Sequence, residues 1–346
     1  MAGRYGPSAA LDAKGTVSAR TGAVSCRPLA HRSVPRPRPL TRQSRVAVAA
    51  PASAALDPAD AEAGLKALRA RGLRVETVRP MSPEPFGYLA GNDDARTKEL
   101  NTLLSRKDLD AIFCLRGGYG VLRLLGTLDY DAARQHPKLV IGYSDITALH
   151  LALYARTGLP GLSGPMVAPD WPTLDAASED QFWALAGGAT PVKIIGPKGE
   201  ALHGMHDGAA EGVLLGGNLT MVAALLGTPY LPDLTGTILF LEDVGEKPYQ
   251  IDRLLARLHL AGVLERLGGL VFGAFTHAEP SANRPSLSLK DVLAHYARCV
   301  PGPVASGLVY GHFPQKSTLP VGVRASLEVS EGNVSLVIVE PVTHSS

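Results

Sequence analysis

The sequence has few cysteines and no long apolar run. Its three cysteines, Cys26, Cys114 and Cys299, are scattered along 346 residues. This number and spacing give neither a disulfide framework nor a zinc-binding pattern, and a reducing compartment is the simplest interpretation. No apolar run approaches the roughly 18 residues that a membrane span needs. We therefore expect no disulfide, no metal and no membrane partner.

Acidic residues are almost absent from the first 45 residues. Nine positive charges and one acid, Asp12, give +8 there, which leaves −6 on residues 46–346 because the net charge is +2. The net negative charge of residues 46–346 argues against a nucleic-acid partner, since phosphate contacts need clustered Lys and Arg. Residues 1–44 are rich in Arg, Ser, Ala and Pro, and we predict that they are disordered. Their composition also fits an organelle transit peptide. A disordered extension without a targeting role is the alternative.

Glycine and proline are plentiful, at 37 and 27 residues, while aromatic residues make up only 5%. This composition is typical of a turn-rich α/β chain, and the length predicts about two domains. In residues 45–165, strands at 46–50, 73–78, 111–115 and 139–142 alternate with helices. This alternation predicts a parallel, flavodoxin-like sheet with helices on both faces. The expected helices are one capped by Asp57 or Asp60 and ending near Arg71, then 95–105, 121–128 and 145–156.

After residue 165 the pattern changes. We interpret residues 166–206 as a linker with a short helix near 178–185, and residues 207–346 as a C-terminal mixed α/β domain with a β-rich core. Its expected helices are 214–226 and 249–264, and its expected strands are 237–241, 269–275 and 304–309. Residues 325–329 and 334–339 flank the turn Glu331-Gly332-Asn333, which is a hairpin signal.

Ser144 lies where an apolar strand ends and a helix begins, in the sequence GYSD. Hydrolases of the α/β type hold a nucleophilic serine at such a turn. The second glycine of the G-x-S-x-G motif is missing here, and a helix N-cap is the alternative role for this serine. The position therefore suggests acyl-transfer chemistry without choosing between the two roles.

A glycine-rich turn, RGGYG at residues 116–120, follows the preceding apolar strand. The backbone N–H groups of Gly117 and Gly118, together with that of Asp145, can stabilise a developing oxyanion. A plain tight turn is one alternative. Phosphate binding is another, but no Walker lysine or G-x-G-x-x-G spacing accompanies the turn. Arg116 can pair with a substrate carboxylate or only cap the turn.

A general base and an acid that orients it must come from elsewhere in the chain. Two of the ten histidines, His277 and His312, directly follow apolar strands. Glu242 and Asp243 end another strand, and either carboxylate can orient a histidine, although surface or capping carboxylates are commoner. His203 and His206, in HGMHD, are weak evidence for a metal, because two ligands on a loop do not make a site.

Four blocks in order carry a family resemblance: RGGYG, GYSDITALHLAL, FLEDVGEKPYQIDRLL and GLVYGHFPQKSTLPVG. From about residue 45 to about residue 340, the chain resembles the LD-carboxypeptidase family of serine peptidases. That family includes muramoyltetrapeptide carboxypeptidases and microcin C immunity peptidases. The resemblance implies a Ser–Glu–His triad of Ser144, Glu242 and His312, with the oxyanion donors on the backbone of Asp145 and of the Gly117–Gly118 turn.

The resemblance further implies a function. The expected reaction removes a terminal D-alanine from muropeptide tetrapeptides in peptidoglycan recycling, without cofactor or metal, in a cytoplasmic homodimer. Residues 45–165 would carry the nucleophile, residues 207–346 would carry the glutamate and histidine, and Arg116 is the candidate for the substrate carboxylate. One alternative is cleavage of a peptidyl-nucleotide or another amidated acyl compound, with Trp171 in an aromatic pocket. Another is a non-catalytic muropeptide-binding module. The chain departs from many members at Ser163, where a histidine is expected.

Overall fold

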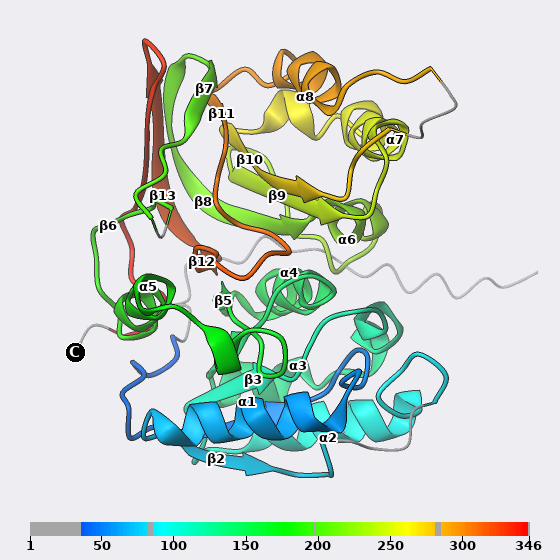
Figure 1. Ribbon diagram of the computed structural model, residues 1–346, viewed down its shortest axis with the longest axis vertical. Helices are drawn as coiled ribbons and strands as arrows, with labels where there is room; N and C mark the ends of the chain where they lie inside the picture. Colours follow the sequence, from blue (N-terminus) through cyan, green and yellow to red (C-terminus); the bar gives the residue numbers. More distant parts are fainter. Residues whose placement is uncertain (1–35, 82–85, 197, 281–284, 345–346) are drawn as a thin grey trace, which may run out of the picture. The chain divides into compact units, whose positions relative to one another are not determined.

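The computed structural model describes residues 36–81, 86–196, 198–280 and 285–344. The chain divides into two compact units, Met1–Ser33 and Val34–Ser346. The first unit lies outside the described residues, and the second carries all the features that follow. Among the described residues of this second unit, the strands form two separate sheets with their own helices (Figure 1).

The first sheet is mostly parallel. Its strands are β1 (Arg45–Ala49), β2 (Arg74–Thr77), β3 (Ala111–Cys114), β4 (Leu139–Ile141), β5 (Gly161–Ser163) and β12 (Leu319–Val321). They lie in the order β12-β5-β4-β3-β1-β2, with β1 to β5 parallel and β12 antiparallel at one edge. Every residue of β3, β4 and β5 is buried. Burial on both faces explains why these strands appear in the sequence as continuous apolar runs.

The helices beside this sheet are α1 (Pro58–Ala70), α2 (Asp93–Ser105), α3 (Tyr130–Gln135), α4 (Ile146–Thr157) and α5 (Ala176–Ala186). Asp57 caps α1 by accepting from the N–H of Ala59 at 2.8 Å, as its sequence position predicts. The single helix predicted over 121–128 is wrong: this segment forms two 3₁₀ turns, Val121–Arg123 and Leu125–Thr127. Gly126 lies in its middle, and glycine disfavours a continuous helix.

The second sheet is mixed. Its strands are β6 (Val192–Lys193), β7 (His203–His206), β8 (Gly208–Asn218), β9 (Ile238–Val244), β10 (Gly269–Thr276), β11 (Val304–Ser306), β13 (Val323–Ser330) and β14 (Asn333–Ile338). The order is β6-β14-β13-β8-β9-β10-β11-β7, with a parallel centre from β8 to β11 and antiparallel flanks. Helices α6 (Leu219–Ala224), α7 (Pro248–Leu260) and α8 (Leu289–Ala297) accompany it. The predicted α/β class, with a parallel first sheet and a β-rich mixed second one, is confirmed.

The helix predicted over 214–226 is mostly wrong, because β8 continues to Asn218 and α6 begins only at Leu219. Gly216 and Gly217 have φ values of +141° and +135°, which no α-helix contains. A Cβ on Gly216 would lie 1.9 Å from the Phe240 carbonyl oxygen. This close approach of β8 to β9 requires glycine, and helical periodicity in the sequence does not reveal it.

Residues 36–44 are packed against the rest of the chain, so the disorder predicted for this part of 1–44 is wrong. Leu40 is 4% exposed, its N–H donates to the Ala186 carbonyl at 2.9 Å, and Arg36 pairs with Glu340. Residues 1–35 lie outside the described part.

The predicted linker, 166–206, contains α5, β6 and β7, and the domain boundaries at 165 and 207 stay a prediction. None of the described helices has the length and apolar character to cross a membrane.

Candidate active site

Ser144 lies in the sharp turn between β4 and α4. Its φ is +64°, in the left-handed region that non-glycine residues rarely adopt, and a residue held there is strained. The neighbouring glycine turn approaches very closely, because a Cβ on Gly117 would lie 2.8 Å from the Ser144 Cβ. The turn therefore has the geometry of a nucleophile elbow, in which the serine side chain stands out from the backbone.

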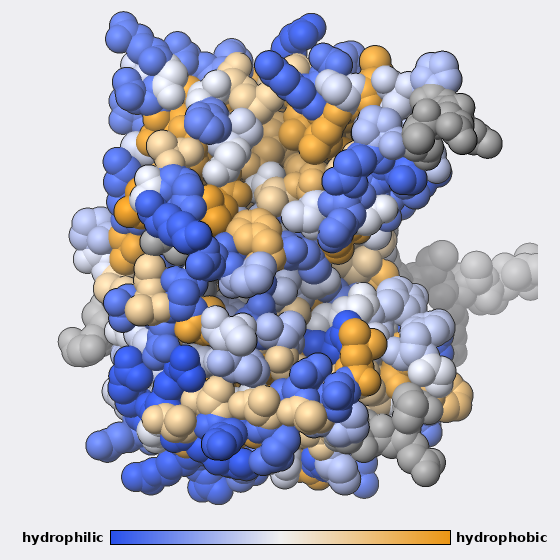
Figure 2. Space-filling view, viewed as in Figure 1, coloured by the Kyte–Doolittle hydropathy of each residue, from blue (hydrophilic) through white to orange (hydrophobic). Residues whose placement is uncertain are grey.

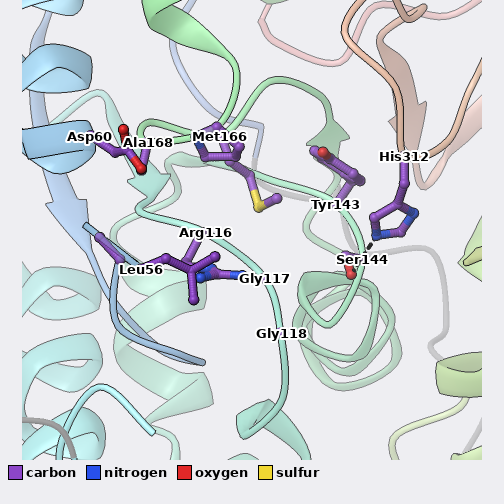
Figure 3. A pocket seen from close by; sticks show the side chains of 12 residues that line it. Leu56, Asp60, Arg116, Gly117, Gly118, Tyr143, Ser144, Met166, Ala168 and His312 are labelled. Carbon is purple, nitrogen blue, oxygen red and sulfur yellow. Dashed lines mark hydrogen bonds between the residues drawn. The ribbon is translucent and has the colours of Figure 1, made fainter. Parts of the chain in front are cut away.

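Ser144, His312 and Glu242 are joined by hydrogen bonds although they are far apart in the sequence. Nε2 of His312 is 2.9 Å from Oγ of Ser144, as Figure 3 shows, and Nδ1 of His312 is 2.8 Å from Oε2 of Glu242. Glu242 is fully buried at the end of β9, while His312 follows β11. The structure thus brings together the serine that follows β4 of the first sheet with two groups of the second sheet, Glu242 within β9 and His312 in the loop after β11.

Burial raises the pKa of Glu242, and its hydrogen bond with His312 opposes that rise. Its other oxygen accepts from Nδ2 of Asn218 at 3.3 Å, a contact that sequence reasoning missed. Asp243 does not contact His312 among the described residues; it accepts from Nδ2 of Asn218 at 2.8 Å and from the N–H of Thr220 at 2.9 Å. Of these two carboxylates at the end of β9, the one at the histidine is Glu242, which is also the one that the family resemblance names.

The glycine turn presents backbone donors to the same place. The N–H of Ser53 donates to the Gly117 carbonyl at 3.2 Å, and in a trans peptide the N–H of Gly118 points the opposite way. Among the described residues, no protein group accepts from the N–H of Gly118 or of Asp145. Asp145 precedes α4, whose first N–H groups have no partner within the helix. Both N–H groups are therefore available to an oxygen bound beside Ser144.

Two buried charged side chains, those of Asp145 and Arg96, fix the glycine turn. The sequence indicates Asp145 only for its backbone N–H group and does not indicate Arg96. Burial raises the pKa of Asp145 to about 6, and its Oδ2 accepts from the N–H of Val121 at 2.9 Å. Arg96 is fully buried and donates to the carbonyls of Gly120, at 3.0 Å, and of Pro51. Buried polar groups need such partners, and here they join the turn to α2 and to the chain after β1.

A cavity of about 200 Å³ opens at Ser144. Its lining residues are Ala55, Leu56, Asp60, Arg116, Gly117, Gly118, Tyr143, Ser144, Met166, Ala168, Pro169 and His312. In Figure 3, Ser144 and His312 lie at one end, and Leu56, Asp60 and Arg116 lie towards the other. Arg116 donates to the Ala54 carbonyl at 3.2 Å, so it both braces the neighbouring loop and faces the cavity.

The remaining candidates from the sequence lie elsewhere. Among the described residues that line the cavity, His277, His203 and His206 do not appear. Within the same part of the chain, no three His, Cys, Asp or Glu residues are grouped as a metal site. Trp171 is fully buried, and its ring packs edge-on against Phe182 at 5.2 Å. The aromatic pocket suggested for Trp171 is therefore wrong, because this ring belongs to the core.

A buried ion pair lies behind the cavity wall. Nζ of Lys316 donates to Oδ1 of Asp170 and to the hydroxyl of Tyr143, both at 2.7 Å. The Tyr143 ring meets the His312 ring edge-on, with centroids 5.2 Å apart. Burial lowers the pKa of Lys316, and the charge of Asp170 opposes that fall. Lys316 and Asp170 are 146 residues apart in the sequence, so no local signal predicts their contact.

Family models, related sequences and solved structures match most of the chain. Two family models match, the LD-carboxypeptidase N-terminal domain over residues 46–164 and the LD-carboxypeptidase C-terminal domain over residues 211–327. The probable murein peptide carboxypeptidase of Bacillus subtilis (strain 168) is 35% identical over 302 residues, which cover 86% of this chain and 92% of the relative. The microcin C7 self-immunity protein MccF of Escherichia coli is 29% identical over 304 residues, which cover 79% and 86%. The crystal structure of muramoyltetrapeptide carboxypeptidase from Oxalobacter formigenes matches with a TM-score of 0.76 at 33% identity, covering 86% of this chain and 99% of that one.

Proposed function

Because the chain belongs to the LD-carboxypeptidase family, we propose that it hydrolyses the amide between an L-residue and a terminal D-alanine in murein tetrapeptides. The hydrogen-bonded series Ser144–His312–Glu242 beside the cavity carries this proposal. A serine hydroxyl becomes a nucleophile when a base removes its proton and a third group orients that base. The murein and muramoyltetrapeptide carboxypeptidases among the relatives support the choice of substrate.

In the acylation step, Nε2 of His312 takes the Ser144 proton while Oγ attacks the carbonyl carbon of the L-residue. Glu242, bonded to Nδ1 at 2.8 Å, holds the imidazole in place and stabilises the imidazolium that forms. The carbon–nitrogen bond then breaks as His312 returns the proton to the leaving nitrogen. D-alanine departs with a free amino group, and the rest of the peptide remains as an ester on Ser144.

The negative charge that develops on the carbonyl oxygen meets the N–H groups of Gly118 and Asp145, with that of Gly117 nearby. Each such donor typically lowers the barrier by about 3–4 kcal/mol, because it is already oriented when the charge appears. His312 takes a proton from water, which attacks the ester carbonyl; the bond to Oγ then breaks, the peptide leaves with a free carboxyl group, and His312 returns the proton to Ser144. Arg116, which lines the cavity, is the proposed partner of the substrate's terminal carboxylate, since a guanidinium can bind a carboxylate through two parallel hydrogen bonds.

The direct test is Ser144→Ala, assayed by mass spectrometry of the products from a defined muropeptide tetrapeptide. We expect loss of D-alanine release with an unchanged melting temperature, because the change removes one oxygen at the surface of the cavity. A fluorophosphonate probe should label the unchanged protein at Ser144 and leave the variant unlabelled. Full activity in the variant would contradict the proposal, and absence of labelling in the folded wild type would favour a muropeptide-binding module instead.

A second candidate function rests on the relative named as a microcin C7 self-immunity protein. An enzyme of that kind would use the same three side chains on a peptidyl-nucleotide or another amidated acyl compound. Turnover on a murein tetrapeptide and on an aminoacyl-sulfamoyl adenylate, compared at equal concentration, separates the two. Faster cleavage of the adenylate would replace the first proposal by the second.

We further propose, from the family alone, a cytoplasmic homodimer in which residues 45–165 and 207–346 form two domains. Light scattering on the purified chain gives the subunit number directly. Mapping the mature N-terminus shows whether residues 1–44 are removed, as a transit peptide would be. A monomer, or a processed protein in an organelle, would revise these points without touching the reaction.

A further inference from the structure

His312 lies in a segment without regular secondary structure. Residues 307–318, between β11 and β12, form neither helix nor strand. Loops are usually more mobile than the elements they connect, yet the imidazole of His312 has to stay within hydrogen-bond distance of both Ser144 and Glu242. Contacts elsewhere in the loop must therefore hold it in place.

The first such contact is made by Tyr310, two residues before His312. The Tyr310 carbonyl accepts from the N–H of Ala274 in β10 at 2.9 Å, and its ring packs edge-on against Phe240 in β9, with centroids 5.2 Å apart. Its hydroxyl lies 2.5 Å from Oγ of Ser163 in β5. Tyr310 is fully buried and Ser163 is 1% exposed. One side chain thus joins the second sheet to the first, just before the histidine.

The second contact is made by Lys316, four residues after His312. Its ammonium bonds to the hydroxyl of Tyr143, in the turn that carries the nucleophile, and to Oδ1 of Asp170. Oδ2 of Asp170 accepts from the N–H of Met166, a residue of the cavity wall, at 2.8 Å. Lys316 is only 2% exposed, so it is hidden beneath the largely hydrophilic surface of the molecule (Figure 2). One ammonium therefore ties the histidine loop to the nucleophile turn and to the cavity wall.

We propose that Tyr310 and Lys316 are positioning residues, which act on the reaction through His312. Each fastens one side of the histidine loop to the sheet that carries Ser144, although β11, from which the loop leaves, belongs to the other sheet. The imidazole is thereby kept in line with the serine hydroxyl. This inference rests on the proposed function, in which His312 is the base. A merely structural role, in which these bonds only satisfy buried polar groups, is the alternative that the test has to separate.

The test removes the first anchor without leaving an unpaired polar atom. Tyr310→Phe or Ser163→Ala alone leaves one buried hydroxyl without its partner, which is destabilising, whereas replacing both partners by apolar groups can be nearly neutral. The double variant should therefore melt close to the wild type. The first measurement is the rate at which a fluorophosphonate labels Ser144, because this rate depends on the alignment of serine and histidine and needs no peptide.

We expect a fluorophosphonate to label the double variant at least about tenfold more slowly than the wild type, since a misplacement of about 1 Å can cost about 10²-fold. For a murein tetrapeptide, kcat should fall by a similar factor. KM should stay unchanged, because neither Tyr310 nor Ser163 lines the cavity. A purely structural contact would move the melting temperature and leave both rates per folded molecule as they are.

Two single variants complete the test. Tyr296→Phe is the matched control, because it removes a tyrosine hydroxyl that bonds to Asp252 at 2.6 Å in the α7–α8 region, away from the cavity lining, so labelling should keep the wild-type rate. Tyr143→Phe weakens the second anchor, since it removes the hydroxyl that accepts from Lys316 and keeps the ring. Labelling should slow by a smaller factor here, because Lys316 retains its bond to Asp170.

The outcomes keep this inference apart from the proposed function. A double variant that melts and reacts like the wild type overturns the positioning role and leaves the carboxypeptidase reaction standing. Slow labelling at an unchanged melting temperature supports it. If the double variant melts much lower, Tyr143→Phe decides, and labelling of this variant at the wild-type rate overturns the positioning role. A wild type that cleaves no tetrapeptide and takes no label overturns the proposed function, and this inference falls with it.

Discussion

The two halves of the site are held in place by different means. On the first sheet, Ser144 and the glycine turn are positioned by backbone: a residue at positive φ, a glycine with no room for a Cβ, and N–H groups at the start of a helix. On the second sheet, Glu242 and His312 are positioned by side chains that hydrogen-bond to one another and to Asn218. We therefore expect activity to depend on the backbone shape of the first half and on the charge and protonation of the second.

The largest effect should come from the charge-sensitive half. Glu242→Gln keeps the shape but removes the carboxylate that we propose stabilises the imidazolium, so kcat should fall by about 10³–10⁴-fold, as for the corresponding change in Ser-His-Asp enzymes. The matched control is Asp243→Asn, a neighbouring buried acid that bonds to α6 and Asn218 instead of His312. If both variants lose the same activity, the acid at His312 has no special role and the comparison fails.

Lys316→Met should reduce stability strongly, because it leaves Asp170 buried without its charged partner. Breaking a buried pair in this way typically lowers the free energy of unfolding by about 3–5 kcal/mol. Urea denaturation measures the change, and the double variant with Asp170→Leu should recover most of it, since no unpaired charge remains. An unchanged free energy of unfolding in Lys316→Met would mean that the pair is not buried as described.

Gly117→Ala tests the shape-sensitive half. The added Cβ would lie 2.8 Å from the Ser144 Cβ, so the turn must shift and its N–H groups move away from the oxyanion. We expect kcat to fall by about 10²-fold, close to the loss of one oxyanion donor. Gly126→Ala is the control, because its Cβ would meet only the Tyr230 hydroxyl, at an ordinary 3.7 Å. A normal kcat in Gly117→Ala would refute the backbone account of this half.

The smallest expected effect concerns how stability depends on pH. Two residues, one in the turn before α4 and one within α4, make opposing contributions to it. Burial raises the pKa of Asp145 to about 6 and lowers the pKa of His150 to about 4. The raised acid stabilises the fold at low pH and loses that contribution as pH rises through 6. The depressed histidine contributes stability above about pH 6.5 and loses it as pH falls towards 4.

These two contributions are each about 3 kcal/mol and oppose each other between pH 4 and 6.5. The contributions of these two residues therefore nearly cancel over this range. His150→Leu removes the histidine contribution, so the free energy of unfolding of the variant, relative to that of the wild type, should decrease as pH rises from 4 to 6. Urea denaturation of both proteins at several pH values measures this difference, and an increase with pH would reverse the assignment.

Much of the site was predictable because its residues follow strands. Apolar runs that end in GYSD, in RGGYG and in LED are visible without a structure, and the family resemblance that they support is confirmed by the family models. Without the family resemblance, the residues alone leave Glu242 and Asp243 as equal candidates, since both end the same strand; the resemblance names Glu242. Their separation depends on which side of β9 each faces and on Asn218, which only the folded sheet brings close.

Other features depend on long-range contacts that leave no local pattern. The predicted helix over 214–226 includes Gly216 and Gly217, whereas the close approach of β8 to β9 requires an extended strand there. β12 has only three residues, and its pairing with β5 spans more than 150 positions. Short strands of this kind have too little sequence to show a period.

The pairing of β12 with β5 has a consequence for the synthesis of the protein. His312 lies 168 residues after Ser144, and its loop leads directly into β12, which closes the edge of the first sheet. At about 5–20 residues per second, a ribosome needs roughly 10–30 s to add those residues after the serine. The Ser144 hydroxyl has no His312 beside it throughout this interval, so the proposed hydrolytic activity can begin only once nearly the whole polypeptide has been made.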